Sequence, residues 1–372
     1  MTARSQSAPP AADAASPRFG WWACAAHVWI LSGLLLDGWF HNNSPQVETF
    51  FTPWHGVLYS GVGVAVAVIG EQMLRARRRG VSWRSSIPVG YGLAVIGGAV
   101  FVGGAMADMA WHELLGIEVG VEALLSPTHL TLAVAGFLVF TGPLRAAQRT
   151  VAATAPAADI WPAVLSVAFV VTLIGFFTQY VNPLTHLYPV AVPGAGEVDL
   201  LNAAGIAGIL LFAAVLAAAV LVVVLRWRPP VGALFAIVVI PAAAMATQQG
   251  TYQLLPGVIL AGLACEVLSV GLRPAADRVA AARITAAAVP ALVVTSYVLT
   301  LGLTGDVRWS VHLLTGAVAL SAIAGALVGL AMTTPQAVAA PLSASADGSL
   351  VRRSDIPARR TDERATAGRV RS

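Results

Sequence analysis

Ten apolar stretches set the main constraint on how this chain can fold. A transmembrane helix needs about 20 consecutive apolar residues. Stretches near that length lie at 21–40, 55–74, 87–111, 127–144, 159–180, 200–225, 231–248, 254–272, 284–303 and 311–332. Only 11% of the 372 residues are charged, against about a quarter in soluble domains. The sequence therefore predicts an all-α polytopic membrane protein with about ten transmembrane helices, and it excludes an ordinary soluble enzyme.

The arginines predict the orientation of these helices. All 22 basic residues are arginine, and with ten crossings 21 of them fall on the side that carries both termini, leaving only Arg308 on the other. Positively charged loops are retained in the cytoplasm. We therefore expect both termini to be cytoplasmic in a multi-pass protein of the inner (plasma) membrane. The net charge of +4 follows from this topology and gives no reason to expect a nucleic acid partner.

Composition divides the chain into four segments. Residues 1–20 form an Ala-, Ser- and Pro-rich cytoplasmic tail, and the span that follows is too long for a signal peptide and lacks a cleavage site. Residues 21–147 hold the first four spans and nearly all the candidate chemistry, and residues 148–332 hold six supporting spans. The composition of residues 333–372 predicts a disordered, Arg-rich cytoplasmic tail.

One pattern of polar residues occurs twice, at the outer ends of the first four spans. Its first copy is Asp37, His41, Glu48, Pro53 and His55, and its second is Asp108, His112, Glu122, Pro127 and His129. Both copies read D-x3-H and then E-x4-P-x-H, with three extra residues between the two parts in the second copy. This pattern predicts a repeated helical hairpin, in which spans one and two are copied as spans three and four.

These residue types in this spacing favour a metal site. Residues four apart share a helix face, and proline is favoured in the first turn of a helix, so each hairpin can offer an aspartate and two histidines at adjacent helix ends. Ionisable groups at this depth are costly unless they are paired or functional. Imidazole suits copper, zinc or iron. The predicted metal ligands are Asp37, His41, His55, Asp108, His112 and His129.

Two further acids have predicted roles beside these ligands. Glu48 and Glu122 would be additional ligands, partners of the imidazole N–H groups, or catalytic proton acceptors. The only cysteines, Cys24 and Cys265, lie within apolar spans, so neither a disulfide framework nor a cysteine-based metal site is expected. The alternative interpretation of the whole pattern is an inherited repeat whose polar residues only hydrogen-bond the loops together.

The first copy of the pattern resembles a known copper-ligand motif. Asp37, His41 and, after thirteen intervening residues, His55 are similar to the site in the C subunit of copper-dependent membrane monooxygenases, which oxidise methane, ammonia or short alkanes. The second copy is similar to that subunit's other three-residue site, but it has Asp108 where the family has asparagine, and sixteen residues separate its histidines. The resemblance covers about residues 30–135.

The resemblance implies a function and partners. These are copper-dependent oxidoreductase chemistry on a small apolar or other small molecule at the extracytoplasmic face, with further membrane subunits or a homo-oligomer. Two other functions stay open from the residues alone, a metal- or proton-coupled transporter and a zinc-dependent membrane hydrolase. A transporter needs a polar path inward, for which Glu266 is the strongest candidate, although this residue could equally pair with a polar neighbour. His27, deep in the first span, is expected to be a core residue.

Overall fold

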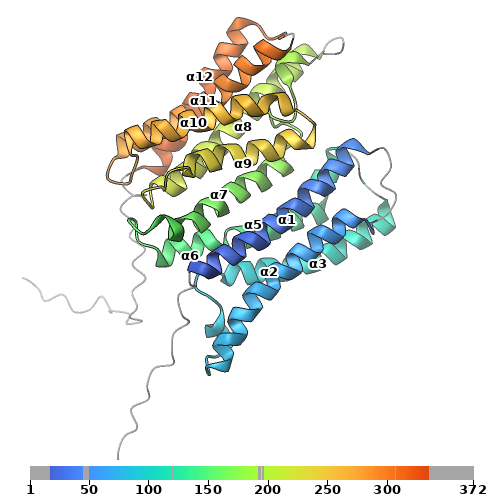
Figure 1. Ribbon diagram of the computed structural model, residues 1–372. Helices are drawn as coiled ribbons and strands as arrows, with labels where there is room; N and C mark the ends of the chain where they lie inside the picture. Colours follow the sequence, from blue (N-terminus) through green and yellow to red (C-terminus); the bar gives the residue numbers. More distant parts are fainter. Residues whose placement is uncertain are drawn as a thin grey trace, which may run out of the picture.

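A computed structural model describes residues 17–44, 50–116, 118, 120–191, 194, 197–305 and 307–334 (Figure 1). In this part of the chain nine helices are long and apolar enough to cross a membrane, and there is no strand beyond one isolated bridge. The predicted helical membrane fold is confirmed. The span expected at 231–248 is present as α9 (Ala233–Gln248), an apolar helix of 16 residues. At about 1.5 Å per residue it is shorter than the about 30 Å of a bilayer's hydrocarbon core.

The first half consists of two helical hairpins. In the first, α1 (Pro17–Asn43) packs along α2 (Pro53–Arg78), and in the second, α3 (Gly92–Leu115) packs along α5 (Pro127–Phe140). The short α4 (Glu122–Leu125) precedes α5, and α6 (Gly142–Thr150) follows it. Both α1 and α3 extend a few residues beyond the predicted spans, so that His41 and His112 lie within helices.

Glycines bring the helices of each hairpin close together. A Cβ atom on Gly33 of α1 would lie 2.4 Å from the backbone of Leu58 in α2. Gly104 of α3 precedes Asp108 by four residues, as Gly33 precedes Asp37, and its Cβ would lie 3.1 Å from the side chain of Leu132 in α5. Small residues at such crossings allow close backbone approach. This proximity lets side chains at the outer end of one helix reach those of the next.

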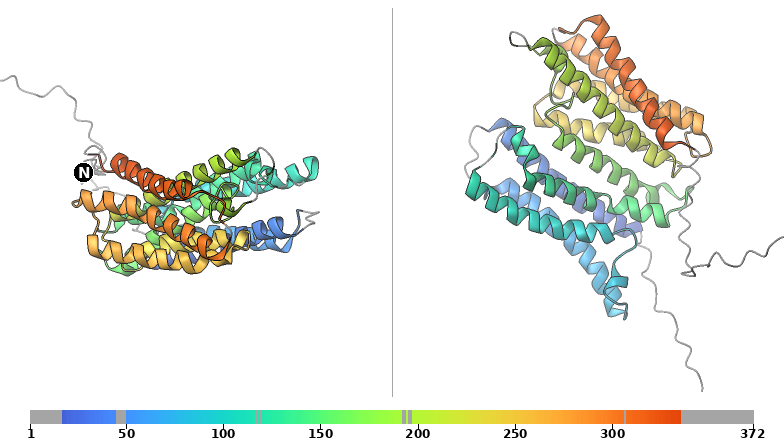
Figure 2. Two further views of the ribbon diagram at one scale, coloured as in Figure 1. Left: turned by 90° about the horizontal axis from the view of Figure 1, so that it is seen from above. Right: turned by 180° about the vertical axis from the view of Figure 1, so that it is seen from behind.

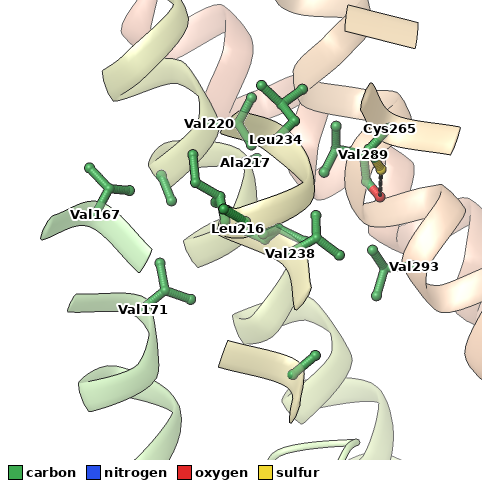
Figure 3. Packing of buried hydrophobic residues seen from close by; sticks show 14 of the residues in the cluster. Val167, Val171, Leu216, Ala217, Val220, Leu234, Val238, Cys265, Val289 and Val293 are labelled. Carbon is green, nitrogen blue, oxygen red and sulfur yellow. Dashed lines mark hydrogen bonds between the residues drawn. The ribbon is translucent and has the colours of Figure 1, made fainter. Parts of the chain in front are cut away.

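The second half packs around a large apolar core. It comprises α7 (Ala157–Phe177), α8 (Val198–Val224), α9, α10 (Leu255–Leu272), α11 (Val279–Thr304) and α12 (Val311–Met332). Figure 3 shows the centre of this core, where Leu216, Val238 and Val293 meet and the Cys265 thiol donates to the Val289 carbonyl at 4.0 Å.

Helix α7 joins the two halves. It packs against α1 and α5 on the side of the first half and against α9 on the other. Phe169 and Leu173 belong to the apolar cluster of the two hairpins, whereas Val164 and Val171 belong to the core of the second half. Figure 2 shows the long helices side by side, with the start of α1 and the end of α12 at the same end of the bundle. That arrangement suits an even number of crossings.

Two polar residues within the helices, Glu266 and His27, have contacts that give them a structural role. Glu266 of α10 accepts hydrogen bonds through Oε2 from the backbone N–H groups of Leu234 and Phe235, at 3.1 and 3.2 Å. These are unpaired donors in the first turn of α9, so Glu266 caps a neighbouring helix. The expected core position of His27 is confirmed, because its side chain is 2% exposed between the rings of Phe140 and Phe169.

Candidate metal centre

The first triad consists of Asp37, His41 and His55. Asp37 and His41 lie one turn apart near the end of α1, and His55 lies in the first turn of α2. Thr52 caps α2 by accepting from the His55 backbone N–H at 3.3 Å, and Pro53 begins the helix. Oδ1 of Asp37 lies 3.1 Å from Nε2 of His55 and 3.7 Å from Nε2 of His41.

The second triad consists of Asp108, His112 and His129. It has the same construction, with Asp108 and His112 one turn apart on α3 and His129 in the first turn of α5. Ser126 caps α5 by accepting from the His129 backbone N–H at 3.4 Å, and Pro127 follows it. The Asp108 carboxylate lies 3.6 Å from Nε2 of His112 and 3.5 Å from Nε2 of His129.

All six predicted ligands therefore fall into two groups of three. Within each triad, one potential ligand atom from each residue lies within 4.8 Å of the others. Ligand bonds to a transition metal are about 2 Å long, so atoms at this separation can surround one ion after small side-chain movements. In the part of the chain that the structure describes, these are the groups of three or more that could hold a metal.

The imidazoles are held in an orientation that suits metal binding. Nδ1 of His55 lies 2.5 Å from the Phe50 carbonyl oxygen, which can only accept, so the proton of a neutral ring lies on Nδ1. Nδ1 of His129 lies 2.8 Å from the Ser126 hydroxyl, which holds the ring in place but can either donate or accept. Partners of this kind fix the ring and direct the free Nε2 lone pair at a metal. Both free nitrogens lie beside the aspartate of their own triad.

The aspartates provide a test of whether a cation fits. Oδ1 of Asp37 and Oδ1 of Asp108 are buried, and among the described contacts to them are histidine nitrogens, Nε2 of His55 at 3.1 Å and Nε2 of His129 at 3.5 Å. In the first triad this oxygen faces the Nε2 lone pair of neutral His55, and two acceptors 3.1 Å apart repel each other. Either a proton on Nε2 or a metal ion between the two atoms relieves this contact. His41, the third predicted ligand, lies beside the same oxygen of Asp37, and this favours the metal over the proton.

Glu118 is a residue that the sequence pattern did not single out. Its Oε2 lies 3.2 Å from Nδ1 of His112, and its side chain is only 13% exposed. Glu118 is therefore an acidic neighbour of His112 at 3.2 Å without a hydrogen bond of normal geometry, whereas the Phe50 carbonyl is hydrogen-bonded to His55. A count from the first histidine of each copy would have found it, because Glu48 follows His41 by seven residues and Glu118 follows His112 by six.

The two predicted acids have different outcomes. Glu122 begins α4 with an exposed side chain, and no ion pair joins it to a histidine among the described residues. Its expected role beside the ligands stays a prediction. Glu48 lies outside the residues that the structure describes, as do residues 1–16 and 335–372, which hold most of the predicted tails. A second signal was missed in the sequence, since both histidines that open a helix follow a Ser/Thr-Pro-x-His pattern.

The two triads lie close to each other. The ring of Phe50 lies 4.8 Å from the ring of His55 and 6.0 Å from that of His112, measured between centroids. Both triads also border one cavity of about 240 Å³, which Asp37, His55 and Asp108 help to line. The two sites therefore share one internal space.

Residues of the second half hold the outer end of α1 in place. The Asn42 side chain, next to His41, donates to Oε1 of Gln179 at 2.9 Å. Gln248, which is fully buried, donates from Nε2 to the Leu35 carbonyl at 3.1 Å. The turns after α7 and α9 thus border the site, where Gln179 and Gln249 line the cavity.

His186 contributes another polar group to this region. Its side chain lines the cavity from the turn after α7. Partial burial lowers the pKa of His186, because desolvation penalises the charged imidazolium. It belongs to neither triad.

Comparisons with known proteins give no family for this chain. It matches no family model, no curated protein and no solved structure. The chemistry of the two triads therefore rests on their own residues.

Proposed function

We propose that this chain is a membrane metalloprotein that binds one transition metal ion in each triad at the extracytoplasmic face of the inner membrane. The observation that carries the proposal is the convergence of an aspartate and two imidazoles within 4.8 Å, twice, with Oδ1 of each aspartate buried beside a histidine nitrogen. The distribution of arginines supports the orientation.

We further propose that the two hairpins are an internal repeat and that the metal is copper, with zinc and iron as alternatives. The matching positions of glycine, aspartate, histidine and helix cap in the two hairpins support the repeat. Nitrogen ligands from imidazole suit copper, and the first triad has the spacing of the monooxygenase C-subunit motif. By that resemblance the protein is an oxidoreductase for a small, mainly apolar substrate and works with other membrane subunits or as a homo-oligomer.

The residues of this chain have distinct tasks under this proposal. Asp37, His41 and His55 hold the first ion, and the Phe50 carbonyl keeps the His55 ring in place. The apolar wall of the cavity keeps bulk water from the ions, which strengthens electrostatic interactions there. A copper ion would supply one-electron redox chemistry at each triad.

Metal analysis of the purified protein tests this proposal. We expect two ions per chain in the wild type, one in His41→Ala/His55→Ala and one in His112→Ala/His129→Ala, measured by ICP-MS. The matched control is His312→Ala, because His312 is exposed and lies outside both triads. A wild-type protein without stoichiometric metal would refute the proposal.

The identity of the ion separates the alternatives. Copper with nitrogen hyperfine splitting in its EPR spectrum supports the oxidoreductase, whereas zinc alone supports the hydrolase. A proton-coupled transporter would need Glu266 in an inward polar path. The contacts of Glu266 weaken this alternative, because its carboxylate is engaged in capping α9.

A further inference from the structure

The cavity between the triads has one polar end and one apolar end. At its polar end lie the aspartates of both triads, together with Asn42 and Gln179. Below them its walls are aliphatic and aromatic side chains from α1, α2, α3, α5 and α7, among them Ile30, Leu58, Phe101, Leu132, Phe140 and Leu173. A mostly apolar cavity with a few converging polar groups is typical of a ligand site. Such a ligand must itself have a polar end and an apolar end.

The size of the cavity limits the ligand. Its volume is about 240 Å³, more than the about 150 Å³ that holds a benzene ring in a protein core and less than the about 300 Å³ at which drug-sized pockets begin. Along α1, the lining extends seven residues from Asp37 to Ile30, or about 10 Å at 1.5 Å per residue. Along α3, Phe101 likewise precedes Asp108 by seven residues. The cavity is therefore long enough for a chain.

The corresponding chain length follows from covalent geometry. With carbon–carbon bonds of about 1.5 Å and near-tetrahedral angles, an extended chain advances about 1.3 Å per carbon. About eight carbons thus cover the distance from the aspartates to the deepest lining residues of α1 and α3. On α5 the lining continues farther, from His129 to Phe140.

The polar end determines the head group. The Asp108 carboxylate, in a residue that is 1% exposed, has His112 and Thr128 beside it, and its Oδ1 lies 3.5 Å from Nε2 of His129, which leaves this oxygen able to accept from a further donor. A hydroxyl group can donate to this oxygen and can also offer its own lone pair to a metal ion in the triad. An alkane offers neither interaction, and a carboxylate head cannot donate.

We propose that this cavity binds a medium-chain aliphatic alcohol, with the hydroxyl between the two triads and the tail directed toward Ile30, Phe101 and Phe140. The inference rests on the proposed function in one respect, since the triads that bind metal also receive the hydroxyl. Occupation of the apolar part needs no metal. The ligand reaches the cavity where exposed residues such as Val121 and His186 line it.

Photolabelling of the full-length protein in lipid nanodiscs tests this inference. Two 1-octanol probes are used, one with a diazirine beside the hydroxyl and one with it next to the chain end, and adducts are located by mass spectrometry. We expect the first probe to label residues near the triads, such as Tyr59 and His129, and the second to label Phe101 or Phe140. Unlabelled 1-octanol should abolish both sets of adducts, and octane should not.

A pair of variants on α5 provides the control. Leu132 lines the cavity and is 8% exposed, whereas Leu130 on the same helix is 44% exposed. Leu132→Trp should fill the cavity and remove the adducts, and Leu130→Trp should leave them unchanged. Leu132→Phe, with a smaller added volume, should reduce them if the tryptophan variant does not fold.

The outcomes separate this inference from the proposed function. Adducts confined to lipid-facing residues, equal protection by octane, or an unchanged pattern in both Leu132 variants would overturn the inference. Metal content is measured by ICP-MS on the same samples. Bound metal without cavity adducts therefore leaves the metal proposal standing, and cavity adducts without metal refute that proposal alone.

Discussion

Replacement of Glu118 by glutamine should weaken metal binding at the second triad and leave the first unchanged. The carboxylate contacts Nδ1 of His112 at 3.2 Å, and Nε2 of the same ring faces Asp108. A carboxylate in this position fixes the ring and makes the opposite nitrogen a better ligand. Because the Glu118 side chain is only 13% exposed, water cannot easily replace it.

The expected loss of metal affinity depends on how much of the contact between Glu118 and His112 each variant keeps. Loss of such an outer partner lowers metal affinity by about 10- to 100-fold, which corresponds to about 1.4–2.7 kcal/mol of binding free energy. Glu118→Gln keeps the shape and one acceptor oxygen, so we expect about a tenfold loss. Glu118→Ala removes both and should reach the upper part of this range.

Calorimetric titration with a competing chelator measures this change. Titration in the His41→Ala/His55→Ala background isolates the second triad. The control is Glu122→Gln, because Glu122 is an exposed acid of the same interhelical segment. Equal effects of the two glutamine variants would show that only the overall charge of the segment matters. An unchanged affinity of Glu118→Gln in this background would refute the assigned contact.

Three further predictions concern single positions. Asp37→Asn and Asp108→Asn should each remove one metal ion per chain and retain the other, measured by ICP-MS, because each aspartate belongs to a different triad. Gly33→Ala should lower the free energy of unfolding by about 1–3 kcal/mol in a thermal or denaturant assay, since its Cβ would meet the backbone of α2 at 2.4 Å, whereas Gly63→Ala, with open space around it, should not. Glu266→Gln should lower stability by about 0.5–2 kcal/mol, as the loss of a helix cap does, and leave metal content unchanged; a loss of metal would contradict its capping role.

The parts of the site that depend on local spacing could be predicted from the sequence. Asp37 and His41 are one helical turn apart whatever the rest of the chain does. Pro53, two residues before His55, likewise marks the start of a helix. Because both rules act within a few residues, they locate the six ligand candidates that the structure brings together in two groups of three, whereas the sequence left open whether these form one site or two.

The remaining features depend on contacts that spacing does not encode. Glu118 follows His112 by six residues where Glu48 follows His41 by seven, so spacing marks its neighbourhood but not its contact with the His112 ring. The cavity depends on how α7 packs against α1 and α5. The predicted span at 231–248 appears as a 16-residue helix that begins after Gly232, whose φ of 92° is left-handed, and packs between α7 and α10.

The contacts of Gln248 and Asn42 have a consequence for how the two halves of the chain depend on each other. An ion in the first triad binds only when the outer end of α1 is in place, and that end is hydrogen-bonded to residues after α7 and at the end of α9. By mass action, a ligand that binds only the assembled state stabilises it, by about 2.7 kcal/mol at a hundredfold excess over Kd. Under the proposed function, metal would thus also stabilise the contacts between α1 and the helices of the second half, which hold no ligand.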